Sequence, residues 1–224
     1  MRAWTFTSRG SPSKVLTLRS DLPIPLASDL KPNEVLIKIS YTALNPGFVV
    51  AIALLPHFNS SPWIPEIEFS GTVAAIGDNS TTRFEIGDAI FGGQSLAGHW
   101  KYGGCLAEYV VTTSDLIVEK PKNVSMAGAC GLAGVGCTAI QAGRVVGLKR
   151  GDKILVNGAS GGLGTILVQY CRAVVGETGS IVATCSEANT ELVKSLGADE
   201  VRRPVVTSDC HCTAGKDSVL IPET

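Results

Sequence analysis

A glycine-rich turn between an apolar strand and an amphipathic helix constrains the fold of this chain more than any other feature. The short apolar run Lys153 to Asn157 is followed by glycines at 158, 161, 162 and 164. Apolar residues from Leu163 to Val174 then recur at helical spacing, and Ile181 to Cys185 is a second apolar run. A short amphipathic segment, Thr190 to Leu196, comes next. The order strand, helix, strand, helix predicts a βαβ unit with a parallel sheet.

The residues of this turn have the properties that a dinucleotide pyrophosphate requires. Phosphates need backbone N–H donors at a helix N-terminus and an approach that no Cβ obstructs. Gly161 and Gly162 provide that approach, and Gly164 lets the helix pack on the strand. With their neighbours Ser160 and Leu163 they form the predicted cofactor-binding turn. The alternative interpretation is a glycine-rich helix start that binds no ligand.

The end of the second strand bears on which dinucleotide fits. An NAD site usually carries Asp or Glu here, which accepts hydrogen bonds from the ribose 2′-hydroxyl. This strand ends in A-T-C-S, so Ser186 stands at that position. Ser186 and Asn189 have donors for a 2′-phosphate, and Lys194 adds positive charge, which favours NADPH. Alternatively, Ser186 only caps the following helix.

The region before this unit has a different character. Val35 to Ala43, Gly71 to Ile76, Phe84 to Phe91 and Ala107 to Val118 are short strand-like runs separated by Gly, Pro and Asp. Such spacing predicts a compact β domain. Pro121 marks the change, and Ser125 is placed to cap the first helix that follows. This change predicts a domain boundary between residues 122 and 123.

Composition excludes several classes of function. The 224 residues carry 19 Lys and Arg against 20 Asp and Glu, a net charge of −1, which provides no electrostatic footprint for nucleic acid or an anionic membrane. With 45% hydrophobic residues the chain can bury a core. Its seven cysteines, an odd number, lie mostly in apolar segments, which indicates thiols in a reducing compartment. Because no signal-peptide h-region is visible, the cytoplasm is the default location.

Several motifs, in order, resemble the medium-chain dehydrogenase/reductase superfamily, specifically its zinc-free, quinone oxidoreductase-like (enoyl reductase-like) branch. They span residues 1 to 200, and the set is specific. They are A-L-N-P from Ala43, E-F-S-G-T-V from Glu68, F-E-I-G-D-A-I-F-G from Phe84, G-G-C-L-A-E-Y-V from Gly103, G-L-A-G-V-G-C-T-A from Gly131, the segment around the glycine turn, and C-S-E-A-N-T-E-L-V-K-S-L-G-A-D from Cys185.

The resemblance implies a GroES-like β-barrel domain at 1–122 followed by an incomplete, doubly wound Rossmann domain at 123–201. NADPH and a small-molecule substrate would bind between them, with hydride transferred to a quinone, an enone or an enoyl thioester. Asn45 resembles the family's active-site Asn, a neutral donor to a carbonyl, although an Asn-Pro turn explains it equally well. Thr138 resembles a residue lining the cofactor cleft, or is a small packed helix residue.

Zinc ligands are missing from the positions where the family's zinc enzymes have them. Asn45 lies where the first ligand is expected, Ile67 where a His is expected, and Cys105 is alone in the lobe region. Thiolate and imidazole bind zinc, so neither the catalytic nor the structural zinc site of those enzymes can be built, and no metal is predicted. The cluster Cys210-His211-Cys212 is interpreted as incidental. His57 and His99 lie in polar stretches and are expected to be solvated.

The match to the family stops near Val201, so the resemblance is to a C-terminally truncated member with domains at 1–122 and 123–201 and a divergent tail at 202–224. The first strand of the βαβ unit is therefore expected to lose a neighbour and to expose an unpaired edge. A homodimer is left open, because the strand that usually forms it is missing. Two hypotheses remain: an active, zinc-independent NADPH reductase, and an inactive relative that acts as a nucleotide-binding or interaction remnant.

Overall fold

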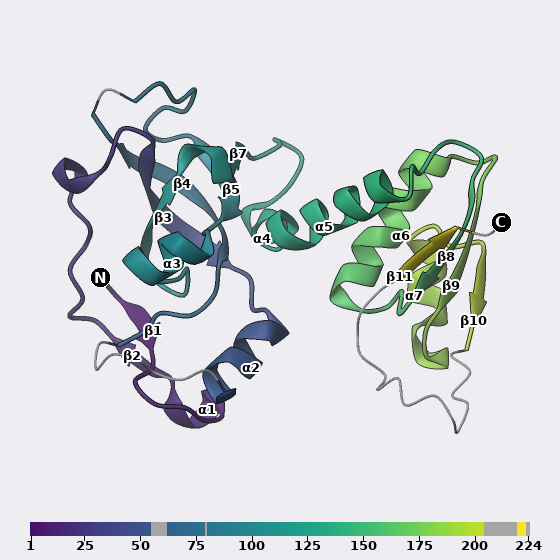
Figure 1. Ribbon diagram of the computed structural model, residues 1–224, viewed down its shortest axis with the longest axis horizontal. Coiled ribbons are helices and arrows are strands. Elements are labelled where there is room, and N and C mark those ends of the chain that lie inside the picture. The colour runs from purple at the N-terminus through teal and green to yellow at the C-terminus, as the bar shows by residue number, and fades with distance from the viewer. Residues whose placement is uncertain (55–61, 79, 204–218, 223–224) are drawn as a thin grey trace. The chain divides into compact units, whose positions relative to one another are not determined.

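The computed structural model describes residues 1–54, 62–78, 80–203 and 219–222 (Figure 1). The chain divides into two compact units, Met1–Gly134 and Val135–Thr224. The division falls within helix α5 (Leu132–Val145), whereas the change in sequence pattern lies at residue 122.

The first unit is built on a five-stranded antiparallel sheet with the strand order β6-β3-β4-β5-β7. A separate antiparallel pair, β1-β2, lies near the N-terminus. The expected strands at 35–43 and 71–76 are thus confirmed as parts of β3 and β4. The strands are β1 (Ala3–Thr5), β2 (Thr17–Arg19), β3 (Glu34–Thr42), β4 (Glu68–Ile76), β5 (Ala89–Gly93), β6 (Tyr109–Thr113) and β7 (Ile117–Glu119).

The core of this unit is formed by alternate residues of the sheet. Val35 and Ile37 of β3, Phe69 and Val73 of β4, and Ile90 of β5 are almost completely buried and belong to one cluster. Their spacing of two along each strand, or of four in β4, places their side chains on one face of the sheet. Because Leu36, between Val35 and Ile37, is buried as well, the partly alternating pattern identifies residues of the core but does not predict which residues of the sheet are exposed.

Short helices connect and cover the strands of the first unit. They are α1 (Pro12–Val15), η1 (Ala27–Asp29), α2 (Pro46–Leu54), α3 (Leu96–Tyr102), η2 (Ser114–Leu116) and α4 (Met126–Cys130). The predicted cap at Ser125 is confirmed, since its Oγ accepts a hydrogen bond from the Gly128 N–H at 3.0 Å.

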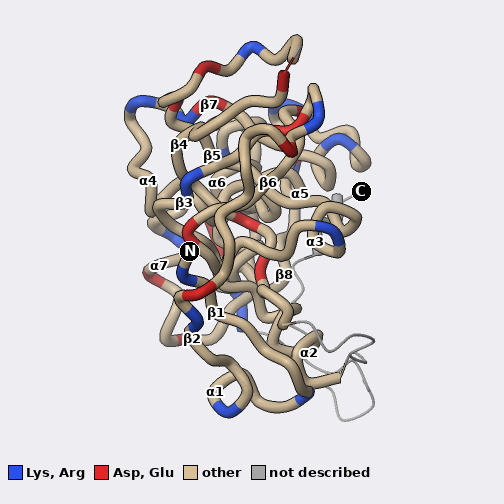
Figure 2. Tube along the Cα trace, turned by 90° about the vertical axis from the view of Figure 1, so that its left-hand side faces the viewer, with Lys and Arg blue, Asp and Glu red and all other residues tan. Residues whose placement is uncertain are grey.

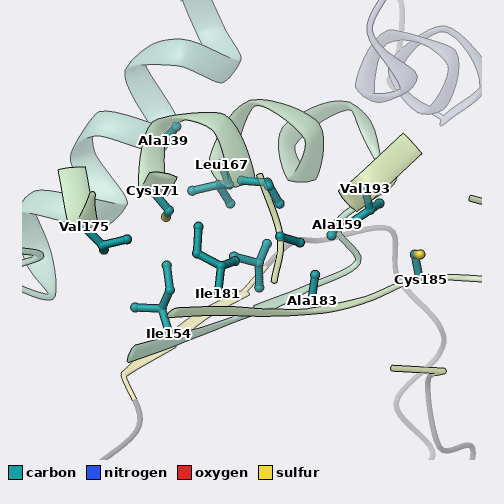
Figure 3. Close-up of a cluster of buried hydrophobic side chains, with 13 residues drawn as sticks. Ala139, Ile154, Ala159, Leu167, Cys171, Val175, Ile181, Ala183, Cys185 and Val193 are labelled. Atoms are coloured by element: carbon teal, nitrogen blue, oxygen red, sulfur yellow. The ribbon is translucent and has the colours of Figure 1, made fainter. Parts of the chain in front are cut away.

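The second unit contains the predicted βαβ arrangement. Its sheet has the order β10-β9-β8-β11, and β8 pairs with β9, and β9 with β10, in parallel. Helix α6 packs on these strands, and Leu167, Val168 and Cys171 of its inner face meet Ile154 and Ile181 in a buried apolar core (Figure 3). The elements are α5, β8 (Lys153–Asn157), α6 (Gly162–Val175), β9 (Ser180–Thr184), η3 (Glu187–Asn189), α7 (Thr190–Ser195), β10 (Glu200–Arg202) and β11 (Val219–Pro222).

The expected unpaired edge beside β8 is wrong. Strand β11 pairs with β8 antiparallel, with Val219 opposite Asn157 and Pro222 opposite Ile154. The sequence of the tail resembles nothing in the family pattern, yet its backbone N–H and C=O groups complete the ladder of the first parallel strand. Pairing of this kind depends on the backbone, so it leaves little signal in a divergent sequence.

A single arginine ties together three turns of the second unit. The Arg172 guanidinium donates to the carbonyl oxygens of Gly197 at 3.0 Å and Gly176 at 2.6 Å, and it pairs with the carboxylate of Asp199. The same carboxylate accepts from the Ile181 N–H at 2.7 Å, and the Asp199 N–H donates to the Ile181 carbonyl at 2.9 Å. The starts of β9 and β10 are thereby joined to the end of α6.

Charged residues of both signs are interspersed along the trace (Figure 2). In the described parts of the chain, no helix combines the length and the apolar character needed to cross a lipid bilayer.

Candidate functional site

The glycine turn of the second unit is tightly wound against the start of α6. Gly158 has a φ of +69°, a conformation that favours glycine. A Cβ on Gly164 would lie 2.2 Å from the Gly158 carbonyl oxygen, closer than any side chain tolerates. The role predicted for Gly164, close packing of the helix against the turn that ends the strand, therefore has a direct steric reason.

The N-terminus of α6 is open in front. The cap residue Gly161 has extended backbone and no side chain to accept hydrogen bonds from the first N–H groups of the helix. A Cβ on Gly162 would meet nothing within 4 Å, whereas the Leu163 side chain packs on the core. Ser160 is half-buried beside them. The turn thus offers backbone donors and free space, the two features that an anionic phosphate needs.

Thr184 fixes the turn from the neighbouring strand. Its Oγ1 donates to Asn157 Oδ1 at 2.5 Å and accepts from the Gly158 N–H at 3.0 Å, while its carbonyl accepts from the Ala159 N–H at 2.9 Å. The carboxyl ends of β8 and β9 are therefore held together. This is the edge of a parallel sheet where ligands of α/β proteins bind.

Three residues are predicted to face the 2′-phosphate of the cofactor. Ser186 and Asn189 lie together after β9, whereas Lys194 is separate from them. The Asn189 amide Nδ2 donates to Ser186 Oγ at 3.0 Å, and Ser186 makes no side-chain cap to the helix that follows it. Lys194 is exposed on α7, and within the described ranges no hydrogen bond or ion pair joins it to either residue. Arg203, which the sequence reasoning missed, pairs with Glu187 at 2.6 Å.

Thr138 lies on α5 in the second unit and is exposed. This exposure favours an accessible side chain over the alternative of a small, packed helix residue. Its part in a cofactor cleft stays a prediction.

In the first unit, two buried carboxylates surround Asn45. The Asn45 backbone N–H donates to Glu66 Oε2 at 3.1 Å, and its side-chain Nδ2 donates to Glu66 Oε2 and Glu68 Oε2, each at 3.3 Å. Asn45 comes directly before α2, and Glu68 begins β4. The predicted active-site Asn is thus built into a hydrogen-bonded cluster with two acids that local sequence patterns did not single out.

Burial sets the protonation chemistry of this cluster. Burial raises the pKa of Glu66 above its usual range, against the hydrogen bonds from Asn45, and the nearby charge of Glu68 raises it further. Burial also raises the pKa of the Cys105 thiol well above normal, with a smaller contribution from the charges of Glu66 and Glu68. Burial therefore disfavours the thiolate of Cys105, which is the form that acts as a nucleophile.

Helices α4 and α5 close the other side of Glu68. A Cβ on Gly134 would lie 1.9 Å from Glu68 Oε1, so this position of α5 must lack a side chain. The Cys130 thiol, at the end of α4, donates to the Ala127 carbonyl at 3.2 Å, and burial followed by the Glu68 charge raises its pKa.

The expectation that His99 is solvated is wrong. It lies on α3, is 8% exposed, and packs with ring centroids 5.4 Å from Phe48 and 6.1 Å from Trp63. Burial lowers its pKa, and its Nδ1 has no hydrogen-bond partner among the described residues. Aromatic residues that are distant from His99 in sequence thus bury its ring. His99 lines a cavity of about 350 Å³ formed by residues 62–64 and 99–103.

Within the described ranges, no three His, Cys, Asp or Glu side chains converge as a metal ion requires. Cys210, His211, Cys212 and His57 lie outside the described residues.

Comparison with known proteins places this geometry in a family. Residues 31–122 match the alcohol dehydrogenase GroES-like domain. The chain is 34% identical to a trans-enoyl reductase of Penicillium oxalicum over 90% of its own length and 60% of the other. It is 33% identical to a chloroplastic NADPH-dependent alkenal/one oxidoreductase of Arabidopsis thaliana, over 89% and 51%.

The fold agrees with a solved structure. The quinone oxidoreductase of Coxiella burnetii superposes with a TM-score of 0.77 at 29% identity, over 90% of this chain and 62% of that one. The chain spans between about half and about three fifths of the length of these proteins. The expected fold class, a GroES-like domain followed by an incomplete Rossmann domain, is confirmed. The chain belongs to the medium-chain dehydrogenase/reductase superfamily, in its quinone oxidoreductase-like branch.

Proposed function

We propose that this protein is a zinc-independent, NADPH-dependent oxidoreductase that transfers hydride to a quinone, an enone or an enoyl thioester. The observation that carries the proposal is the open N-terminus of α6 behind a glycine turn, at the carboxyl end of a parallel sheet. The names of the relatives, trans-enoyl reductase, alkenal/one oxidoreductase and quinone oxidoreductase, support the same class of reaction.

The residues of the turn are proposed to hold a dinucleotide. A Cβ on Gly162 would meet nothing within 4 Å, which supports room for a pyrophosphate there, and the N–H groups of Gly162, Leu163 and Gly164 would donate to it. Ser160 and Gly161 would line the same approach. When bound, NADPH supplies the hydride, and the chain's own residues bind, orient and exclude water.

The preference for NADPH is supported by the residues after β9. Ser186 is exposed and linked to Asn189, so a hydroxyl and an amide stand where a carboxylate would repel a 2′-phosphate. Lys194, on the following helix, would add positive charge. Thr138 is proposed to border the nicotinamide half of the cofactor, and Asn45 to contact the substrate.

Thermal unfolding of the whole chain with NADPH, with NADH and without nucleotide tests this function. A ligand that binds the folded state raises the midpoint. We expect a larger rise with NADPH than with NADH, followed by NADPH oxidation in the presence of 1,4-benzoquinone or an enone. A midpoint that neither nucleotide changes would contradict the proposal. Binding without oxidation in a substrate screen would instead favour the nucleotide-binding relative without catalysis.

A matched pair of variants locates the binding. Gly162→Asp places a carboxylate in the open space before α6 and should remove the effect of NADPH without lowering the unliganded midpoint, because an acid suits a helix N-terminus. Gln169→Glu adds the same charge at an exposed position further along α6 and should keep the NADPH effect.

A further inference from the structure

We propose that Glu66 is a positioning residue, which orients the side-chain amide of Asn45 so that its oxygen, and not its nitrogen, is offered to a bound molecule. The inference rests on the proposed function, in which Asn45 contacts the substrate. In this arrangement Asn45 presents a hydrogen-bond acceptor to the substrate, in place of the donor that the family resemblance implies. Glu66 is an additional residue that nothing in the family resemblance singles out.

The hydrogen bonds determine which end of the amide faces outward. Asn45 Nδ2 lies 3.3 Å from both Glu66 Oε2 and Glu68 Oε2. Because a carboxylate oxygen accepts and does not donate, the amide nitrogen has to face the two acids. Its two N–H groups are then used, and Oδ1 points away from them. Asn45 is half-buried, and within the described residues no hydrogen bond involves its Oδ1.

The carboxylate form of Glu66 is the form that fixes this orientation, because it can only accept hydrogen bonds. Its Oε2 accepts from both the backbone N–H and Nδ2 of Asn45. The groups that face it electrostatically are Glu68 and Cys105, and the His99 ring hydrogen-bonds the Glu66 backbone. None of these groups supplies a positive charge that would draw the carboxyl away from Asn45.

The backbone of Glu66 gives an independent indication. Its φ is +68°, and among the described residues it is the single non-glycine residue with a positive φ. A side chain at such a position costs about 1 kcal/mol relative to glycine. Glu66 is also 5% exposed, so a carboxyl group is buried at a strained position where glycine would fit better. A glutamate at this position is explained if its carboxylate holds Asn45.

An outward amide oxygen selects its ligand by chemistry. It accepts from an O–H or N–H group and repels a bare carbonyl or ether oxygen. The substrate recognised at Asn45 therefore carries a hydroxyl or N–H donor in addition to the carbonyl group that the proposed reaction requires, and Asn45 contacts that donor and not the carbonyl oxygen. Hydroquinone and 1,4-dimethoxybenzene form a suitable pair of probes, because they share a ring and differ in the donor.

The test is the ratio of the two dissociation constants, measured by ligand-observed NMR without nucleotide. One hydrogen bond predicts about fivefold tighter binding of hydroquinone to the unmodified protein. Asn45→Leu, of similar shape, should bring the ratio to about one. Glu66→Gln can both donate and accept, so Glu68 is left as the single acid that holds the amide nitrogen, and the ratio should fall without reaching one.

Glu66→Gly keeps the proposal testable if Glu66→Gln fails to fold. It relieves the positive φ, so its melting temperature should not fall, while its ratio should fall as in Glu66→Gln. An unchanged ratio in the Glu66 variants, or no preference in the unmodified protein, would overturn the inference. NADPH oxidation with 1,4-benzoquinone is assayed separately. Absence of turnover with an intact, Glu66-dependent ratio would refute the proposed function alone.

Discussion

Gly158 and Gly164 lie in such close contact that a Cβ on Gly164 would come within 2.2 Å of the Gly158 carbonyl oxygen. The contact joins the turn after β8 to the first turn of α6. It explains why a glycine is needed at this helix position, where glycine is otherwise unfavourable.

Gly164→Ala should therefore destabilise the protein although alanine favours helices. The new methyl group overpacks the turn, and we expect a loss of about 1–3 kcal/mol in the free energy of unfolding. Gly162→Ala is the matched control, because its methyl group meets nothing within 4 Å and should leave stability equal or slightly higher. Urea unfolding of both variants provides the comparison. Equal stability of the two would show that the turn yields to the methyl group.

Ser186→Asp should change the nucleotide preference. A carboxylate after β9 repels a 2′-phosphate and accepts from a ribose 2′-hydroxyl. We expect NADPH binding to weaken by about tenfold or more, with NADH binding unchanged or tighter. Isothermal titration with both nucleotides measures this, and Ser186→Ala separates loss of the hydroxyl from gain of charge. If Ser186→Asp weakens both nucleotides equally, the residue acts only on the local fold.

The buried carboxyl of Glu66 should make stability depend on pH in a particular direction. Burial raises its pKa in the folded state, so the folded protein holds this proton more tightly than the unfolded chain. The contribution of this proton to the free energy of unfolding is complete below the ordinary pKa of a glutamic acid. It is lost as the pH rises through the raised pKa of Glu66 in the folded protein. Glu66→Gln has no such proton, so its stability should improve relative to the unmodified protein over that range.

Urea unfolding at a series of pH values measures this difference, in which the other titrating groups largely cancel. A difference that is constant with pH, or that changes in the opposite direction, would show that the pKa of Glu66 is not raised.

The described cysteines should react in an order set by burial. Cys137 is exposed, whereas Cys105 and Cys171 are buried, and burial raises the pKa of Cys171 to about 11. Because the thiolate is the nucleophile, iodoacetamide at pH 8 should label Cys137 first and the two buried thiols only on unfolding. Peptide mass spectrometry over time distinguishes the sites. Labelling of Cys171 as fast as Cys137 in native buffer would contradict the burial described for α6.

The parts of the fold that follow a local period could be predicted from the sequence. Strand β8 runs from Lys153 to Asn157 as expected, and α6 covers the expected helical stretch, because β-branched runs and helical spacing are local signals. The glycine turn could also be predicted, since its chemistry is written in consecutive residues.

Features that depend on distant residues could not be predicted in this way. The burial of His99 arises from Phe48 and Trp63, and nothing near His99 in sequence indicates it. Glu66 and Glu68 belong to an ordinary-looking strand entry, and their contact with Asn45 requires the fold to bring residues more than twenty positions apart together. The pairing of β11 with β8 is likewise a non-local backbone interaction.

The links around Arg172 have a consequence for how the second unit opens. Ile181 and Asp199 exchange hydrogen bonds at the starts of β9 and β10, and Arg172 joins both to α6. The segment between them, which carries Ser186 and Asn189, cannot detach at one end while the other stays closed. In native-state hydrogen exchange, the amides of β9 and β10 should therefore open as one cooperative unit, with the Ile181 amide reporting its free energy of opening.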